Sequence, residues 1–237
     1  MDELDPTFVI VNGENSAAGV GITPEIAEDL IKLGVDAITL GNHAFNKREI
    51  NGYLDSGKPI VRPGNMPDQI PGKGLCTIER DGVILDVINL CGRVFMDSYE
   101  DPFAWIETQL RPDRHCFIDF HAEATSEKIA FGYHVDGRAV AVVGTHTHVT
   151  TADEQILPGG SAYITDVGMC GPIPSVLGMD KDVILHKFRT TLPTRFEVAE
   201  QPGVISAVVI DVNRSNGRAM SIKRLKRGLN DRMAQKS

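Results

Sequence analysis

The sequence has few cysteines and no close pair of them. Its four cysteines, Cys76, Cys91, Cys116 and Cys170, are spread over 237 residues, and none belongs to a CxxC motif. This spacing argues against a zinc–thiolate site. We therefore expect free and mostly buried thiols in a reducing compartment.

Long apolar runs are also absent. No run approaches the roughly 20 residues that a membrane-spanning helix requires. The N-terminal stretch MDELDPTFVIVNGEN has no basic segment before its short apolar run, so it does not resemble a secretory signal. We expect a cytoplasmic protein that does not associate with membranes.

Positive charge is in deficit. The chain has 24 Lys and Arg against 32 Asp and Glu, which gives a net charge of −8. This balance disfavours broad binding of nucleic acids or anionic membranes. We interpret the short basic cluster at 223–227 as a solvated face. An acidic protein that handles phosphate must supply positive charge locally, and a bound metal ion does so compactly.

Apolar and helical patterns alternate along the chain without a repeat or a linker, which indicates a single α/β domain over residues 1–237. With 42% hydrophobic residues, the chain can build a sizeable core. Asn46 is a candidate cap for the second helix. The pattern predicts strands at 7–12, 35–40, 116–120 and 139–143, and helices at 24–33 and 47–57.

Several predicted strands end in loops that carry nitrogen or oxygen ligands. Because the carboxyl ends of parallel strands gather at one edge of a sheet, these side chains could converge. The strand-end residues are Glu14 and Asn15, Asn42 and His43, His121, and the pair His146 and His148.

The pair His146 and His148 suggests two metal ions rather than one. Side chains two apart on an extended segment share a face and lie about 6.6 Å apart. That separation suits one imidazole on each of two ions roughly 3.5–4 Å apart. Glu14 could bridge both ions, and Asn42 could offer an amide oxygen. A mixed nitrogen and oxygen set suits Fe, Mn or Zn better than Ca or Mg.

Each residue also has a purely structural interpretation. A lone histidine at a strand end usually packs or makes a hydrogen bond, and the asparagines could cap loops. Asp166, in the loop DVGMCGP, could be an outer partner of the metal ligands or simple turn chemistry, and we favour the latter. Only the joint occurrence of NGEN, GNH, a strand-end histidine and GTHTH favours a metal site.

The segments GNH and GTHTH resemble signature blocks of the calcineurin-like metallophosphoesterase superfamily. The longer strings VIVNGENSAAGVGIT, ITLGNHAFNKREI and AYITDVGMCGP resemble its small bacterial YmdB-like branch, and the resemblance runs from about residue 6 to the C-terminus. It implies a four-layer α/β/β/α sandwich with a dinuclear metal centre, often of iron. It also implies hydrolysis of phosphodiesters, such as 2′,3′-cyclic nucleotides, by a metal-bridging hydroxide.

The resemblance also implies roles for individual residues. It assigns His43 to the substrate rather than to a metal, as a donor of charge or of a proton to the leaving group. It assigns one metal to Glu14, Asn42, His121 and His146. It assigns the other to Glu14, Asn15 and His148, so that Glu14 bridges the two.

The chain departs from the family pattern at its beginning. Family members start with a strand that carries a metal-binding Asp, followed by a helix, and this strand and most of the helix are absent before FVIVNGEN. The second ion would then have three protein ligands, so we expect either a natural start upstream of Met1 or a weakened relative.

Three functions therefore compete. A metal-dependent phosphodiesterase comes first, and a non-catalytic or weakly active regulatory relative is the alternative. An amidohydrolase is disfavoured, because its HxH motif lies on an early strand of an eight-stranded barrel. The expected partner is a small phosphodiester or cyclic nucleotide, and assembly into a homo-oligomer is left open.

Overall fold

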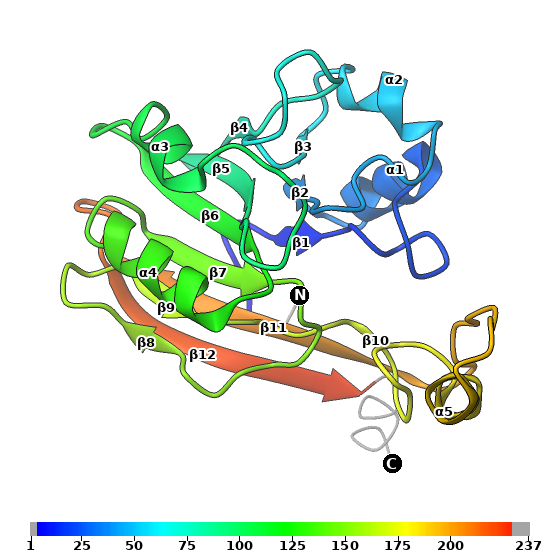
Figure 1. Cartoon of the computed structure of the whole chain (residues 1–237). Coiled ribbons are helices and arrows are strands. Elements are labelled where there is room, and N and C mark those ends of the chain that lie inside the picture. The colour runs from blue at the N-terminus through cyan, green and yellow to red at the C-terminus, as the bar shows by residue number, and fades with distance from the viewer. Residues whose placement is uncertain (1–3, 229–237) are drawn as a thin grey trace.

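The computed structural model describes residues 4–228, which form helices and strands stacked in layers (Figure 1). The helices are α1 Pro24–Lys32, α2 Ile50–Leu54, α3 Pro102–Glu107, α4 Thr125–Val135 and α5 Lys181–Thr190. The strands are β1 Ile10–Asn12, β2 Ala37–Thr39, β3 Ile60–Val61, β4 Leu75–Arg80, β5 Val83–Cys91, β6 His115–His121, β7 Ala141–Thr145, β8 Gln155–Ile156, β9 Ala162–Ile164, β10 Gly171–Pro172, β11 Gly203–Val212 and β12 Ala219–Gly228.

The strands form three sheets. The largest has six strands in the order β4-β5-β6-β7-β9-β8, and its central strands β5, β6, β7 and β9 are parallel. A second sheet, β1-β2-β3, is fully parallel, and the third, β10-β11-β12, is antiparallel. The parallel strands bring their carboxyl ends to one edge of each sheet, as the sequence pattern predicted.

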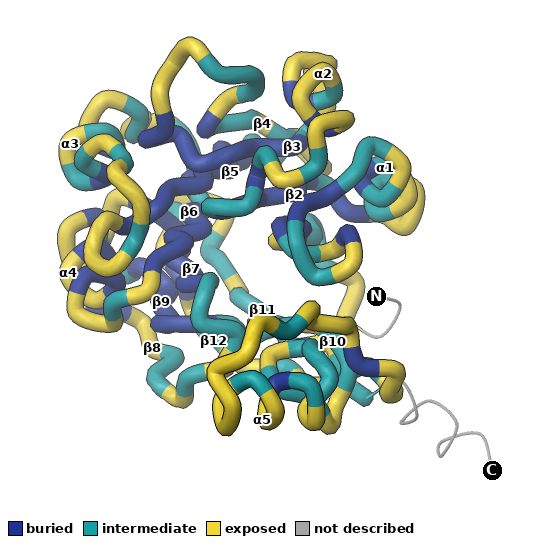
Figure 2. Tube along the Cα trace, turned by 45° about the vertical axis from the view of Figure 1, so that its right-hand side comes forward, coloured by how far each residue is buried: buried dark blue, intermediate teal, exposed yellow. Residues whose placement is uncertain are grey.

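Three apolar clusters separate four layers, so the predicted α/β/β/α sandwich is confirmed. One cluster lies between the β1-β2-β3 sheet and helices α1 and α2, and includes Ile38. A second lies between the sheets and includes Ala37, which points to the opposite face of β2. The third joins the six-stranded sheet to α3 and α4 and includes the stacked rings of Phe120 and Phe131. Figure 2 shows the buried strands at the centre of the molecule.

The layer that contains β1 is interrupted. Ile10 of β1 and Ile210 of β11 pack into the same cluster between the sheets. Their strands nevertheless belong to separate sheets, and β1 is the outer strand of its own. The expectation that a strand of the family pattern is missing stays a prediction. The assignment of residues 1–237 to one domain also stays a prediction, and residues 1–3 and 229–237 lie outside the described part.

The predicted start of the first helix is confirmed. The Thr23 side chain caps α1 by accepting from the Ile26 amide, and Asp101 caps α3. The predicted second helix is shorter than expected. It begins at Ile50, and Asn46 does not cap it, because residues 43–49 form turns instead. Within residues 4–228 no helix combines the length and the apolar character needed to cross a membrane.

Candidate metal centre

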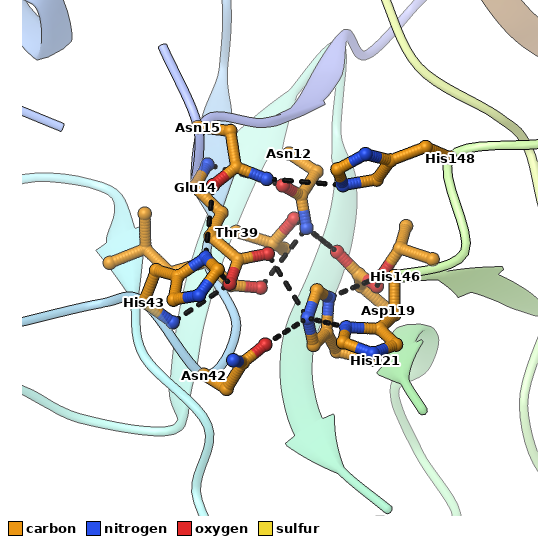
Figure 3. A network of polar contacts seen from close by, with 12 residues as sticks. Asn12, Glu14, Asn15, Thr39, Asn42, His43, Asp119, His121, His146 and His148 are labelled. Carbon is orange, nitrogen blue, oxygen red and sulfur yellow. Dashed lines mark hydrogen bonds and ion pairs between the residues drawn. The ribbon is translucent and has the colours of Figure 1, made fainter. Parts of the chain in front are cut away.

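The ends of four strands bring the predicted ligands together (Figure 3). Glu14 follows β1, Asn42 follows β2, His121 ends β6, and His146 comes directly after β7. The register aligns the last residue of β6 with the last residue of β7, so the two histidines lie side by side. The expected convergence is therefore observed, while the role of each residue as a metal ligand stays a prediction.

Three polar atoms converge on one nitrogen of His121. Its Nε2 lies 2.8 Å from Asn42 Oδ1, 3.1 Å from Glu14 Oε2 and 3.0 Å from His146 Nδ1. His121 and Glu14 are almost fully buried. A ring nitrogen carries either one proton or one lone pair, so it cannot satisfy all three neighbours.

The other ring nitrogen shows which form His121 takes. Its Nδ1 lies 2.9 Å from Thr145 Oγ1, and that hydroxyl donates its only proton to Asp119 Oδ1 at 2.6 Å. The Thr145 oxygen must therefore accept from Nδ1–H. Burial lowers the pKa of His121 well below its usual value, so the ring is neutral and Nε2 presents a lone pair.

A lone pair on His121 thus faces two oxygens, which is an arrangement that a cation stabilises. The donors around it are two imidazole nitrogens, one carboxylate oxygen and one amide oxygen, and this set fits Fe, Mn or Zn. The Asp119–Thr145–His121 chain orients the ring as outer partners of metal ligands do. Within residues 4–228, no three or more His, Cys, Asp or Glu side chains form a ready metal-binding group. Instead, the polar atoms contact one another.

A second group of predicted ligands lies around Asn15. Its Nδ2 is 3.2 Å from His148 Nε2, and its Oδ1 is 3.1 Å from His43 Nδ1. The Asn15 amide donates to His148 Nε2, which leaves the proton of that ring on Nδ1. His148 Nδ1 is buried and has no hydrogen-bond partner among the described residues. The lone pair of this ring is on Nε2, so Nε2 is the nitrogen of His148 that could bind an ion.

The structure corrects the geometry that we predicted for the HxH pair. His146 and His148 do not lie on an extended segment, because their φ angles are 102° and 66°. The loop bends since Asp166 Oδ2 accepts from the Thr147 amide at 3.0 Å and from its hydroxyl at 2.8 Å. The two imidazoles still separate, one toward His121 and the other toward Asn15.

Sequence reasoning missed the ion pair that holds this bend. Lys128 and Asp166 are each 1% exposed, and Lys128 Nζ lies 2.8 Å from Asp166 Oδ2 and 2.7 Å from Thr145 O. The turn chemistry predicted for Asp166 is observed, since its Oδ1 accepts from the Gly168 amide at 2.8 Å, but its Oδ2 also joins α4 to the histidine loop. A signal for Lys128 was its spacing of three and seven residues from Phe131 and Val135, which places it on the buried face of α4.

Glu14 and His43 connect the two groups. Glu14 Oε1 accepts from the His43 amide at 2.8 Å, and its other oxygen faces His121. Burial raises the pKa of Glu14 to about 7, although the hydrogen bond from His43 opposes that rise. The His43 side chain is 39% exposed. With its Nδ1 held by Asn15, its Nε2 is the nitrogen available to a substrate.

Gly41 leaves the space in which the Glu14–His121 group assembles, and its replacement is expected to disrupt the site. A Cβ at this position would lie 2.5 Å from both Glu14 Oε2 and His121 Nε2. We expect Gly41→Ala to lower phosphodiester hydrolysis, the activity that the family resemblance implies, by on the order of 10²-fold. A displacement of about 1 Å at a reacting site is enough for that loss. The measurements are kcat/KM for that hydrolysis and the metal bound per chain.

Gly52→Ala is the matched control for that substitution. Gly52 lies in α2, and its added Cβ would meet no atom within 4 Å. Activity should stay at the level of the unaltered chain. If Gly41→Ala also kept full activity and metal content, the site would not lie where Glu14 and His121 meet.

Comparisons with known proteins point to one family. The model of the YmdB-like protein family matches residues 1–225. A Bacillus subtilis protein named 2′,3′-cyclic-nucleotide 2′-phosphodiesterase is 51% identical over 224 residues, which cover 93% of this chain and 85% of that protein.

Solved structures agree with this match. A hypothetical protein from Thermus thermophilus is 39% identical with a TM-score of 0.89, over 94% of this chain and 88% of that one. A structure titled as a novel phosphatase, from Mycoplasma pneumoniae, is 32% identical with a TM-score of 0.89, over 96% of this chain and 84% of that one. On the family match and these identities, the chain belongs to the YmdB-like protein family.

Proposed function

We propose that this chain is a phosphoric diester hydrolase that cleaves 2′,3′-cyclic nucleotides with the help of bound metal ions. The main support for the proposal is the convergence on His121 Nε2. The oxygens of Glu14 and Asn42 face the lone pair of this nitrogen, and a cation between them would stabilise that arrangement. The names of the relatives support the reaction class, since one is a phosphodiesterase and another a phosphatase. The expected substrate is therefore a small phosphodiester.

Two groups of residues would hold the ions. The first is Glu14, Asn42, His121 and His146, and the second is Glu14, Asn15 and His148. The mixed donor set suits Fe, Mn or Zn, and the family resemblance favours Fe among them. When bound, such ions supply positive charge for the phosphoryl oxygens and a hydroxide nucleophile at neutral pH. The second group has fewer protein ligands, so we expect it to bind its ion more weakly.

The protein's own side chains complete the reaction. Glu14 is held at one oxygen by the His43 amide, so its other oxygen keeps a fixed direction. Nδ1 of His43 is engaged by Asn15 Oδ1, which orients the ring. From this position, protonated His43 would give the proton of Nε2 to the ribose oxygen that leaves phosphorus.

Hydrolysis of 2′,3′-cyclic AMP before and after metal removal tests the proposal. The purified chain should convert the cyclic diester to a monoester. Dialysis against a chelator should abolish this activity, and added Fe²⁺ or Mn²⁺ should restore it. Full activity after removal of all metal would contradict the proposal.

The comparisons do not favour the alternative, a regulatory relative without catalysis. All six predicted ligands and His43 are present, and each of them is joined by a direct polar contact to another member of the set. His43 contacts Glu14 through its backbone amide and Asn15 through its ring, and His148 contacts Asn15. A chain that binds metal and 2′,3′-cyclic AMP without hydrolysing it would revive this alternative.

A further inference from the structure

A surface loop begins directly beside the candidate metal centre. Residues 92–99, which we call the rim loop, connect β5 to the segment before α3. The amide of Gly92 donates to the backbone oxygen of His121 at 3.0 Å, so the loop leaves the sheet next to a predicted ligand. Only glycine fits at its start, since a Cβ on Gly92 would lie 2.5 Å from Glu127 Oε2.

The two ends of the rim loop are fixed by one buried side chain. Asn65 accepts from the Cys91 amide at 2.9 Å and donates to the Cys91 oxygen at 2.7 Å. The same amide group donates to the Glu100 oxygen at 2.8 Å, and the Glu100 amide returns a bond to the Asn65 backbone. The loop therefore has closed ends, as in compact loops that carry function.

A carboxylate of α4 fixes the first turn of the rim loop. Glu127 accepts from the amides of Arg93 and Val94 at 2.9 and 3.2 Å. The next residue, Phe95, is then held at φ 62°, a left-handed conformation that is costly for an aromatic residue. Its side chain is 88% exposed. The aromatic ring of Phe95 is therefore exposed to solvent on a loop that hydrogen bonds to Asn65 and Glu127 hold in place.

The rim loop also borders an open cavity. A cavity of about 480 Å³ is lined by loop residues, among them Asp97, Ser98 and Tyr99, and by Glu127. Because Gly92 leaves the sheet next to His121, a molecule bound at the candidate metal centre lies beside the start of this loop.

We propose that the rim loop is the nucleoside subsite of the enzyme and that Phe95 stacks on the nucleobase. The inference rests on the proposed function, since it concerns the substrate of the same site. Base–aromatic stacking tolerates any base, because every base has a π-face. The subsite therefore favours a diester that carries a nucleobase over one without it, and discriminates little among the four bases.

Two cyclic diesters separate this subsite from the reaction itself. The substrates are 2′,3′-cyclic AMP and glycerol 1,2-cyclic phosphate, which has no base. Phe95→Ala should lower kcat/KM for the nucleotide about tenfold, mainly through KM, and leave the glycerol diester unchanged. Phe95→Trp should restore the nucleotide activity. Phe188→Ala is the control, because Phe188 is an aromatic residue that is 77% exposed on α5.

Equal loss on both substrates, or no loss on the nucleotide, would overturn the subsite. Binding of adenosine 3′-monophosphate by calorimetry gives a second readout that needs no turnover, and Phe95→Ala should weaken it about tenfold. Failure of the unaltered chain to cleave either diester would instead refute the proposed function. In that case the affinity for adenosine 3′-monophosphate still decides whether Phe95 binds a base.

Discussion

Replacing His121 by alanine is expected to lower kcat/KM for 2′,3′-cyclic AMP by on the order of 10³-fold. Its Nε2 is the atom on which Glu14 and Asn42 converge, at 3.1 and 2.8 Å. Loss of an outer partner of a metal ligand typically costs roughly 10- to 100-fold, and loss of the ligand itself should cost more. The measurement is steady-state hydrolysis at saturating Mn²⁺.

His134→Ala is the control for this variant. His134 lies in α4, where its Nε2 pairs with Glu107 Oε1 at 2.8 Å near the surface. Its removal should leave hydrolysis intact. A far-ultraviolet circular dichroism spectrum separates loss of chemistry from loss of fold in His121→Ala. A folded His121→Ala chain with full activity would contradict the assignment of the site.

Replacing Lys128 by methionine is expected to lower the free energy of unfolding by about 3–5 kcal/mol. The ammonium group is fully buried, and its loss leaves the Asp166 carboxylate in the interior without its counter-ion. Because Asp166 also holds Thr147 between the two histidines, metal affinity should fall as well. Urea denaturation measures the first effect and a metal titration the second.

A double-mutant cycle isolates the Lys128–Asp166 pair. Asp166→Asn removes the charge but keeps an amide oxygen that can accept from Thr147. In the Lys128→Met background it should therefore cost less than it does alone, or even recover stability. Additive costs within about 0.5 kcal/mol would show that the ion pair does not couple α4 to the histidine loop.

The sequence predicted the strand ends because each candidate ligand directly follows an apolar run. Glu14, Asn42 and His121 all lie at such ends, so parallel pairing alone brings them together. The four layers could be expected for the same reason, from the alternation of strands and helices. The resemblance then supplied the pairing of ligands with ions, which spacing alone did not.

The bend at the histidine loop could not be predicted from local pattern. The left-handed conformations of His146 and His148 depend on Asp166, which comes about twenty residues later. The spacing of Lys128 from Phe131 indicates the buried face of α4, but its partner Asp166 follows 38 residues later and is not indicated by local pattern. Long-range contacts decide each of these features.

Metal content per chain tests the central claim most directly. Elemental analysis is made on protein purified without added metal, and again after saturation with Mn²⁺ and gel filtration. The account predicts a retained ion in the group around His121, a second ion that appears on saturation, and loss of both in Gly41→Ala. A chain that retains no metal under either condition, or binds it equally well in Gly41→Ala, would contradict the claim.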